Sequence, residues 1–161
     1  MDRSSSLFSR MKDIIYTQKK AWECWSYACL NALQRMWVDI SEEKIISFWS
    51  MLWYPDMEKT LISKWIIKGL STIVSPRRID NYLKAWEKLV VLIYHMNFES
   101  IRNTPYIQDF KGKMNHFVCI VEDLGDRYKV IDQQGYKYDS GYWYIKKEDM
   151  KGNTRVARLI I

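Results

Sequence analysis

The first residue whose position suggests chemistry is Cys24, in the segment QKKAWECWSYACL. Small and apolar residues follow it at four-residue steps, at Ala28, Ala32 and Met36, so a helix should begin at or just before Cys24. Unpaired backbone N–H groups and the helix dipole favour negative charge at that end, and therefore favour a thiolate over a thiol. The pattern predicts a nucleophilic cysteine; the competing interpretation is a buried cysteine that only fills the core.

A second candidate is Gln18, six residues before the cysteine. When a thiolate attacks a carbonyl, the carbonyl oxygen becomes negative and needs hydrogen-bond donors. The backbone N–H groups at the start of the helix supply one donor, and the Gln18 side-chain amide could supply the other if the intervening loop folds back. We therefore expect Gln18 to complete an oxyanion hole.

The remaining candidates lie in two neighbouring strand patterns. His116 begins HFVCIVED, and Asp132 ends RYKVID. The loop Asp123–Gly125 suits a three-residue hairpin in which Glu122 pairs with Asp126, and counting outward then pairs His116 with Asp132. A carboxylate opposite an imidazole fixes its tautomer and leaves the other ring nitrogen for the thiol. The pattern predicts a cysteine–histidine–aspartate triad.

Alternatives exist for each member of this triad. A histidine beside a carboxylate can be an ordinary surface pair, and His95 is the second histidine of the chain. The orienting group could instead be Asp139, Asp126 or the side-chain carbonyl of Gln133. The triad interpretation gains weight because independent features converge on one geometry.

Length and composition place limits on the class of protein. A chain of 161 residues with 48% hydrophobic residues fits a single domain, residues 1–161, with residues 1–12 as a loose polar arm. Three cysteines and two histidines form no disulfide framework or zinc signature, so we expect free thiols and neither a metal nor a cofactor. The sequence lacks a signal peptide and a membrane-spanning run, which predicts a cytoplasmic protein or one exported by another route. The net charge is +6, but the positively charged residues are scattered along the sequence, so we do not expect nucleic acid as a partner.

Helical patterns come first in the chain and strand patterns afterwards, which predicts an α+β fold with a mostly antiparallel sheet. The expected helices run from residue 24 to about 37, from 41 to a stop at Pro55, from 58 to 68, and from a cap at Ser75 to about 86. The expected strands are 88–96, 115–122, 127–131, 142–146 and 154–161. Trp65 and Trp86 occupy core spacings in the helical patterns, so we expect them to be packed inside.

The motifs resemble the papain-like cysteine peptidases, and most closely the bacteriocin-leader (double-glycine) peptidase branch. The resemblance rests on Gln18, on Glu23-Cys24 with Ala28-Cys29-Leu30 behind it, on His116-Phe117-Val118, and on Asp132. It implies a papain-like fold, a polypeptide substrate, Cys24, His116 and Asp132 as the triad, and Gln18 as the oxyanion donor.

Two positions depart from that branch. Trp25 follows the cysteine where the branch has glycine, although Cys-Trp is the usual pair in papain-like enzymes generally, and Gln133 replaces a proline. Trp25 and Gln133 are therefore weaker candidates for substrate contacts. The expected function is peptide-bond hydrolysis. The alternatives are an inactive papain-like binding module, or an acyltransferase or deubiquitinase-type effector with the same triad.

Overall fold

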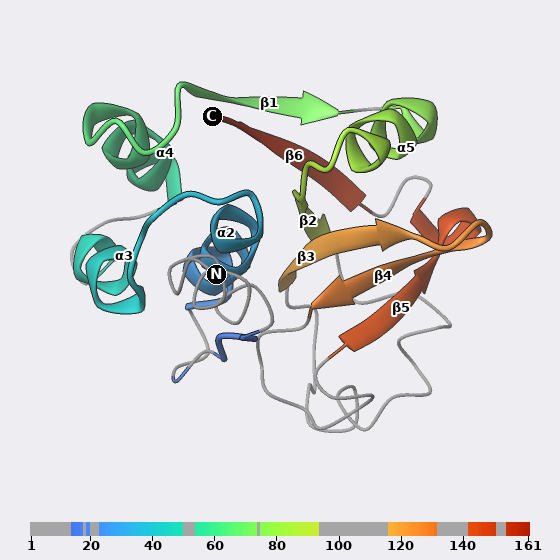
Figure 1. Cartoon of the computed structure of the whole chain (residues 1–161), viewed down its shortest axis with the longest axis horizontal. Helices are drawn as coiled ribbons and strands as arrows, with labels where there is room; N and C mark the ends of the chain where they lie inside the picture. Colours follow the sequence, from blue (N-terminus) through green and yellow to red (C-terminus); the bar gives the residue numbers. More distant parts are fainter. Residues whose placement is uncertain are drawn as a thin grey trace, which may run out of the picture.

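The computed structural model describes residues 14–17, 19, 23–49, 54–73, 75–93, 116–131, 142–150 and 154–161. Within these ranges, the side chains of residues 48, 49, 54–58, 76, 93, 116, 143 and 149 are not described. The described part of the chain has an α+β fold, as expected (Figure 1). Its elements, in chain order, are α2 (Cys24–Arg35), α3 (Glu42–Trp49), α4 (Tyr54–Ser63), β1 (Gly69–Ile73), α5 (Pro76–Lys84), β2 (Leu89–Ile93), β3 (His116–Asp123), β4 (Arg127–Ile131), β5 (Tyr142–Lys146), the 3-10 helix η3 (Lys147–Met150) and β6 (Thr154–Ile160).

The six strands form one antiparallel sheet in the order β1-β6-β2-β3-β4-β5. The last strand, β6, lies between β1 and β2 and closes the gap between them (Figure 1). Strands β2 to β5 follow one another as neighbours. The segments with the densest β-branched sequence, β2 and β3, therefore occupy the middle of the sheet, where both faces are buried.

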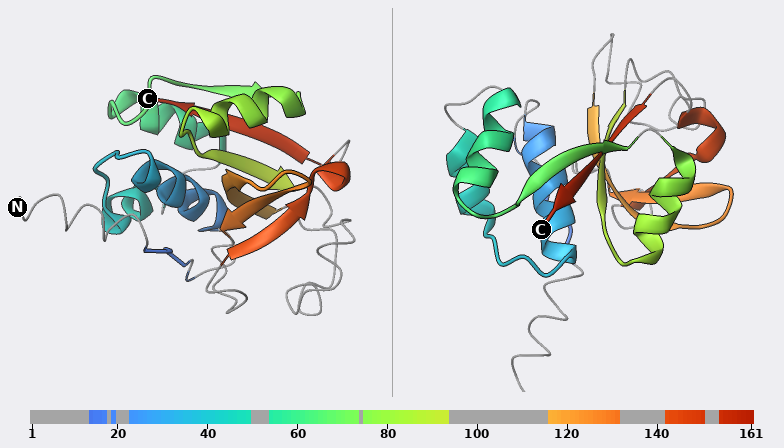
Figure 2. Two further views of the ribbon diagram at one scale, coloured as in Figure 1. Left: turned by 45° about the vertical axis from the view of Figure 1, so that its right-hand side comes forward. Right: turned by 90° about the horizontal axis from the view of Figure 1, so that it is seen from above.

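Helices cover both faces of the sheet and create two cores (Figure 2). On one face α2 packs against β3 and β2, with α3 and α4 beyond it. On the other face α5 and η3 cover residues that alternate with the first set, such as Val118 and Ile120 of β3. Because successive side chains of a strand point to opposite faces, β3 contributes Cys119 to the α2 core and its neighbours to the α5 core.

The local signals placed several element boundaries correctly. Ser41 caps α3, because its Oγ accepts a hydrogen bond from the Lys44 N–H at 3.1 Å. Ser75 occupies the N-cap position of α5 with extended backbone angles, but its side chain makes no capping hydrogen bond. Strands β4 and β5 have the predicted bounds.

The predicted helix over residues 58–68 is wrong at both ends. Helix α4 spans Tyr54–Ser63, and Pro55 lies in its first turn instead of ending the previous helix. A proline in the first turn loses no hydrogen bond, because the first N–H groups of a helix have no partner within it. The early end of α4 leaves room for β1, which pairs with β6 from Gly69↔Ile160 to Ile73↔Val156 and has no counterpart among the predicted elements.

The expectation that Trp65 and Trp86 are core residues is also wrong. Their side chains are 93% and 83% exposed. Each lies two residues beyond the end of a helix, where the chain has left the helical path and the apolar stripe no longer continues. In both cases the helix ends before the tryptophan, so the helical spacing does not predict burial there.

Candidate active site

Cys24 is the first residue of α2, as its sequence pattern predicted. It is half-buried, whereas the residues from Trp25 to Arg35 behind it are buried. The backbone N–H groups of a first helical turn have no partners within the helix and can bind negative charge. The structure therefore puts this thiol where helix geometry favours a thiolate and an oxyanion.

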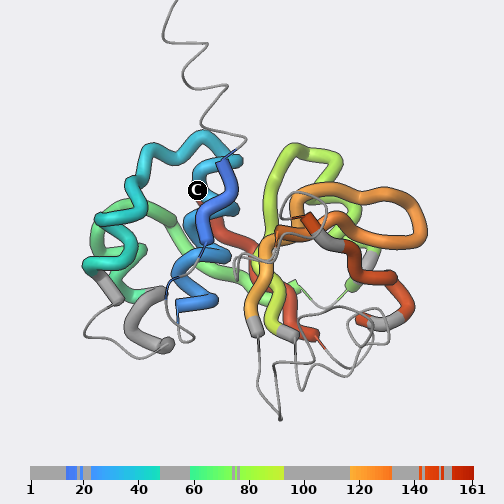
Figure 3. The backbone as a smooth tube through the Cα atoms, turned by 90° about the horizontal axis from the view of Figure 1, so that it is seen from below, coloured from blue at the N-terminus to red at the C-terminus, as the bar shows by residue number. Residues whose placement is uncertain are grey.

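Helix α2 runs alongside β3, with the two elements starting at the same end of the molecule (Figure 3). The ring of Trp25 meets the ring of Phe117 edge to face, with centroids 4.7 Å apart and planes at 64°. At the far end, Arg35 and Val121 line a common pocket. The residue after Cys24 thus touches the residue after His116, although 92 positions separate the paired residues in the sequence.

His116 is the first residue of β3 and lies opposite Ile93 of β2. Its strand position is described, and its side chain is not. Gln18, Asp132 and Gln133 lie outside the described residues, as does Asp139. The structure therefore places the backbone at Cys24 close to the backbone at His116. The roles of the other predicted site residues remain predictions.

The β3–β4 hairpin differs from the predicted one. Glu122 pairs with Lys129, not with Asp126, and Asp123 lies within the ladder opposite Tyr128. The Leu124 N–H donates to the Arg127 carbonyl at 2.9 Å, so only two residues remain in the loop. The predicted loop of three residues is wrong, although Gly125 does take the positive φ, 97°, that the prediction required.

An irregularity in β3 compensates for the shorter loop. The register shifts between Ile120 and Glu122, so that Val121 is the extra residue of a bulge. Beyond the bulge Cys119 lies opposite Ile131, two positions from the predicted partner Lys129. A shift of two preserves the face of every side chain, because the strand period is two. The last described pair thus keeps the predicted face but not the predicted partner, so the register that paired His116 directly with Asp132 is wrong by two residues.

The segment before α2 is held against the helix by side chains of the helix itself. Asn31 accepts a hydrogen bond from the Tyr16 N–H and donates to the Tyr16 carbonyl, both at 2.9 Å. Arg35 donates to the Ile14 carbonyl at 3.3 Å. Residues 14–16 are therefore fixed along α2, which leads the chain from the end of the helix back toward its start.

A buried carboxylate at the N-cap of α2 holds the chain at Lys19. Glu23, 5% exposed, accepts a hydrogen bond from the Lys19 N–H at 3.0 Å. Lys19 follows Gln18 directly and Tyr16 precedes it by two residues, so α2 and its N-cap hold the chain at both of these positions. The amide Asn31, set among the apolar residues Leu30, Ala32 and Leu33, was the sequence signal for this docking, and the sequence interpretation missed it.

The other two cysteines are chemically different from Cys24. All three are free thiols, but Cys29 and Cys119 are fully buried in the α2 core. Burial raises the pKa of the Cys119 thiol to about 12, and burial together with the neighbouring cysteines raises that of Cys29. Both remain protonated thiols near neutral pH, so Cys24 is the accessible thiol.

Two further residues bear on the alternatives. Asp126 lies at the hairpin tip, at the opposite end of β3 from His116, and its carboxylate accepts a hydrogen bond from Arg127 at 3.1 Å. That position removes Asp126 as an orienting group. Trp25 is 2% exposed, which leaves almost none of its surface for a substrate.

Within the described ranges, no group of histidine, cysteine and acidic residues could hold a metal ion. Among the same residues, no helix combines the length and the apolar character needed to cross a membrane. Comparison with known proteins gave no match to a family model, and no match among curated proteins.

Proposed function

We infer that this protein is a thiol hydrolase of the papain-like kind, a cysteine peptidase with Cys24 as nucleophile. The observation that carries this proposal is the contact between Trp25 and Phe117, because it draws the first turn of α2 and the first residue of β3 to one end of the molecule. A thiol at a helix start and a histidine at the start of a neighbouring strand are two of the groups that nucleophilic catalysis needs.

In the proposed reaction, the Cys24 thiolate attacks the carbonyl carbon of a peptide bond. The oxyanion accepts hydrogen bonds from the first N–H groups of α2 and from the Gln18 amide. His116 transfers its proton to the departing amine, and the carbon–nitrogen bond breaks to give an acyl-enzyme. A water molecule, deprotonated by His116, then releases the acid and the free thiol. Asp132 accepts the other ring N–H and keeps the imidazole oriented.

The proposal requires a particular backbone conformation at the start of β3. Phe117, Cys119 and Val121 belong to the core under α2, whereas Val118 and Ile120 belong to the core under α5. Regular alternation continued by one residue would assign position 116 to the second face. The imidazole can reach the thiol only around the end of the strand, so the proposal requires regular pleating to end at Phe117.

The resemblance to the bacteriocin-leader peptidases suggests the type of substrate, an extended polypeptide. The same groups can also cleave isopeptide bonds or transfer an acyl group to another acceptor, because both reactions pass through the same acyl-enzyme. The hydrogen bonds of Tyr16 to Asn31 and of Lys19 to Glu23 support the proposal, since these two residues flank Gln18 closely in the sequence and lie against the helix that carries the nucleophile.

The test is the rate of alkylation by iodoacetamide, followed at each cysteine by mass spectrometry from about pH 5 to about pH 9. We expect Cys24 alone to react rapidly below neutral pH. His116→Ala should slow this reaction and move its pH profile upward, because the imidazolium that stabilises the thiolate is lost. His95→Ala is the matched control and should leave the profile unchanged.

A second measurement separates a hydrolase from an inactive binding module. Gln18→Ala should leave the alkylation profile unchanged but lower kcat for cleavage of a peptide library by about 100-fold or more, the usual effect of losing one oxyanion donor. Slow, uniform alkylation of all three cysteines, with the same profile in His116→Ala, would reject the peptidase and favour the binding module.

A further inference from the structure

Three tryptophans occupy the same special position at the ends of three helices. Trp37, Trp65 and Trp86 follow α2, α4 and α5, and each has a left-handed backbone, with φ of 65°, 60° and 66°. Each helix ends in a Schellman motif, in which the tryptophan N–H and the next N–H bond back to the last turn. Glycine is the usual residue there, because a side chain costs free energy in this conformation.

The tryptophan side chains are exposed despite this cost. Their exposed fractions are 54%, 93% and 83% for Trp37, Trp65 and Trp86. Trp65 and Trp86 contribute little to the core, so burial does not explain a large aromatic group at their strained positions. A role at the surface would explain it.

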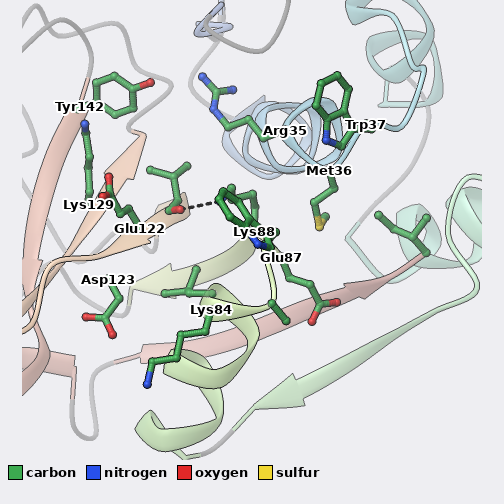
Figure 4. Close-up of a pocket in the computed structure, with 15 residues that line it drawn as sticks. Arg35, Met36, Trp37, Lys84, Glu87, Lys88, Glu122, Asp123, Lys129 and Tyr142 are labelled. Carbon is green, nitrogen blue, oxygen red and sulfur yellow. Dashed lines mark hydrogen bonds between the residues drawn. The ribbon is translucent and has the colours of Figure 1, made fainter. Parts of the chain in front are cut away.

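The three residues gather on one side of the molecule. Trp37 and Trp86 line an open pocket of about 1070 Å³ (Figure 4). Trp65 and Ile62 line a second pocket of about 700 Å³, and Ile161 belongs to both. We call these five residues the tryptophan surface. They make up five of the seven exposed large hydrophobic side chains of the described chain.

The charges around the tryptophan surface are positive. Lys64, Lys68 and Lys84 are exposed, and no ion pair between described residues involves them. The acidic groups of the larger pocket are mostly neutralised. Glu87 accepts hydrogen bonds from Arg158 at 2.9 and 3.2 Å, and Asp123 lies 2.7 Å from the Lys147 ammonium.

Glu122, the third acidic residue of that pocket, lies directly opposite Lys129 in the β3–β4 ladder. Glu122 is exposed, and no ion pair between described residues involves it. The three exposed lysines outnumber this one carboxylate, so the net charge available at the tryptophan surface is positive. This combination of protruding tryptophans and exposed lysines sets the chemistry of the partner.

We propose that the tryptophan surface binds the interface of an anionic lipid bilayer. Tryptophan rings favour the headgroup level, aliphatic side chains enter the acyl boundary, and lysines reach the lipid phosphates. Protein interfaces are depleted in lysine. Ile62 and Ile161 offer no flat face for stacking nucleic-acid bases. A lipid surface accommodates all three kinds of side chain.

The test measures cosedimentation of the full chain with vesicles of phosphatidylcholine, or of equal parts phosphatidylcholine and phosphatidylserine. The variants are Trp65→Gly with Trp86→Gly, and Lys64→Glu with Lys68→Glu. The control is Leu124→Ser, an exposed apolar residue at the β3–β4 hairpin that lines neither pocket. We expect binding only to the phosphatidylserine vesicles, with a partition coefficient that falls about tenfold for each tryptophan lost.

Glycine fits the left-handed positions, so the tryptophan variants should keep the wild-type Tm or exceed it. The lysine variant should also lose binding, and high salt should weaken that of the wild type. Three results would overturn the proposal: absence of vesicle binding, equal binding by wild type and both variants, or binding to a single-stranded oligonucleotide in place of vesicles. The tryptophan variant and the lysine variant are each compared with the wild type, so if one of them fails to fold, the other still tests the proposal.

Discussion

At the scale of single residues, the three cysteines have different environments and should have different chemistry. Cys24 is half-buried at the start of a helix, whereas Cys29 and Cys119 are fully buried between α2 and the sheet. The sequence shows three cysteines but not their exposure, because the fully buried Cys119 belongs to a strand that looks like any other β-branched strand. Their environments follow from how α2 lies on β3.

The buried thiols predict how stability depends on alkaline pH. The pKa of Cys119 rises from about 9 in the unfolded chain to about 12 in the folded protein. The unfolded chain therefore loses its proton first, and this group contributes no pH dependence below about pH 9. Between these values the free energy of unfolding should fall by up to about 1.4 kcal/mol per pH unit.

Urea denaturation at about pH 8 and about pH 10.5 measures this effect. Cys119→Ala should be less stable at the lower pH, because it leaves a small cavity, but should lose less stability on going to the higher pH. Leu124→Ser, which replaces an exposed residue that does not titrate, is the control and should lose as much as the wild type. An equal loss in Cys119→Ala would show that the thiol does not titrate as its burial requires.

At the scale of elements, the hairpin shows how two deviations can together restore the face of a side chain while its partner stays shifted by two residues. The predicted loop of three residues is in fact a loop of two, and the bulge at Val121 restores the face of every residue beyond it. In the sheet β3 lies between β2 and β4, with α2 packed on one of its faces, and the hairpin sequence carries no information about these distant neighbours. The alternation of the strand was predictable because it depends only on the two-residue period.

The docking of residues 14–16 on α2 predicts a positioning role for Asn31. This buried amide makes two hydrogen bonds to Tyr16 and one to the Tyr27 carbonyl, at 2.9 Å each. Asn31→Leu should therefore destabilise the protein by about 2 to 4 kcal/mol, because buried backbone groups lose their partners. It should also release the segment that leads to Gln18.

Hydrogen exchange at the Tyr16 amide, together with the kcat for peptide cleavage, measures this role. Exchange should accelerate and kcat should fall in Asn31→Leu, while the pH profile of Cys24 alkylation stays unchanged, because the thiol and His116 are untouched. Asn81→Leu on the exposed face of α5 is the matched control. A shifted alkylation profile would mean that Asn31 acts on the thiol itself.

At the scale of the whole molecule, the two proposed surfaces lie at opposite ends of α2. The start of the helix carries Cys24, and Trp37 follows its end (Figure 2). A protein bound to a bilayer through the tryptophan surface would therefore present its thiol away from the lipid. This arrangement predicts that the two activities are independent.

The independence can be measured with the same variants in both assays. Trp65→Gly with Trp86→Gly should lose vesicle binding and keep the wild-type alkylation rate of Cys24. Cys24→Ala should bind vesicles as the wild type does. Each glycine should also raise the free energy of unfolding by roughly 0.5 to 1 kcal/mol, because it removes left-handed strain. A slower alkylation rate in the glycine variant would indicate that the two ends are coupled.

The amino-acid sequence by itself determined most of the local structure. Helical and two-residue periodicities located α2 and strands β2 to β6, and the capping signal located the start of α3. They also placed Cys24 at the beginning of a helix and His116 at the beginning of a strand, because such signals depend on neighbours only a few residues away.

The tertiary structure alone decided which elements meet. It placed β6 between β1 and β2, shifted the β3–β4 register at Val121, docked residues 14–16 on α2, and drew three tryptophans from separate helix ends to one side. Each of these depends on contacts between residues far apart in the sequence, and on free energy gained only when whole faces are buried together. A pattern of neighbouring residues therefore cannot predict such contacts.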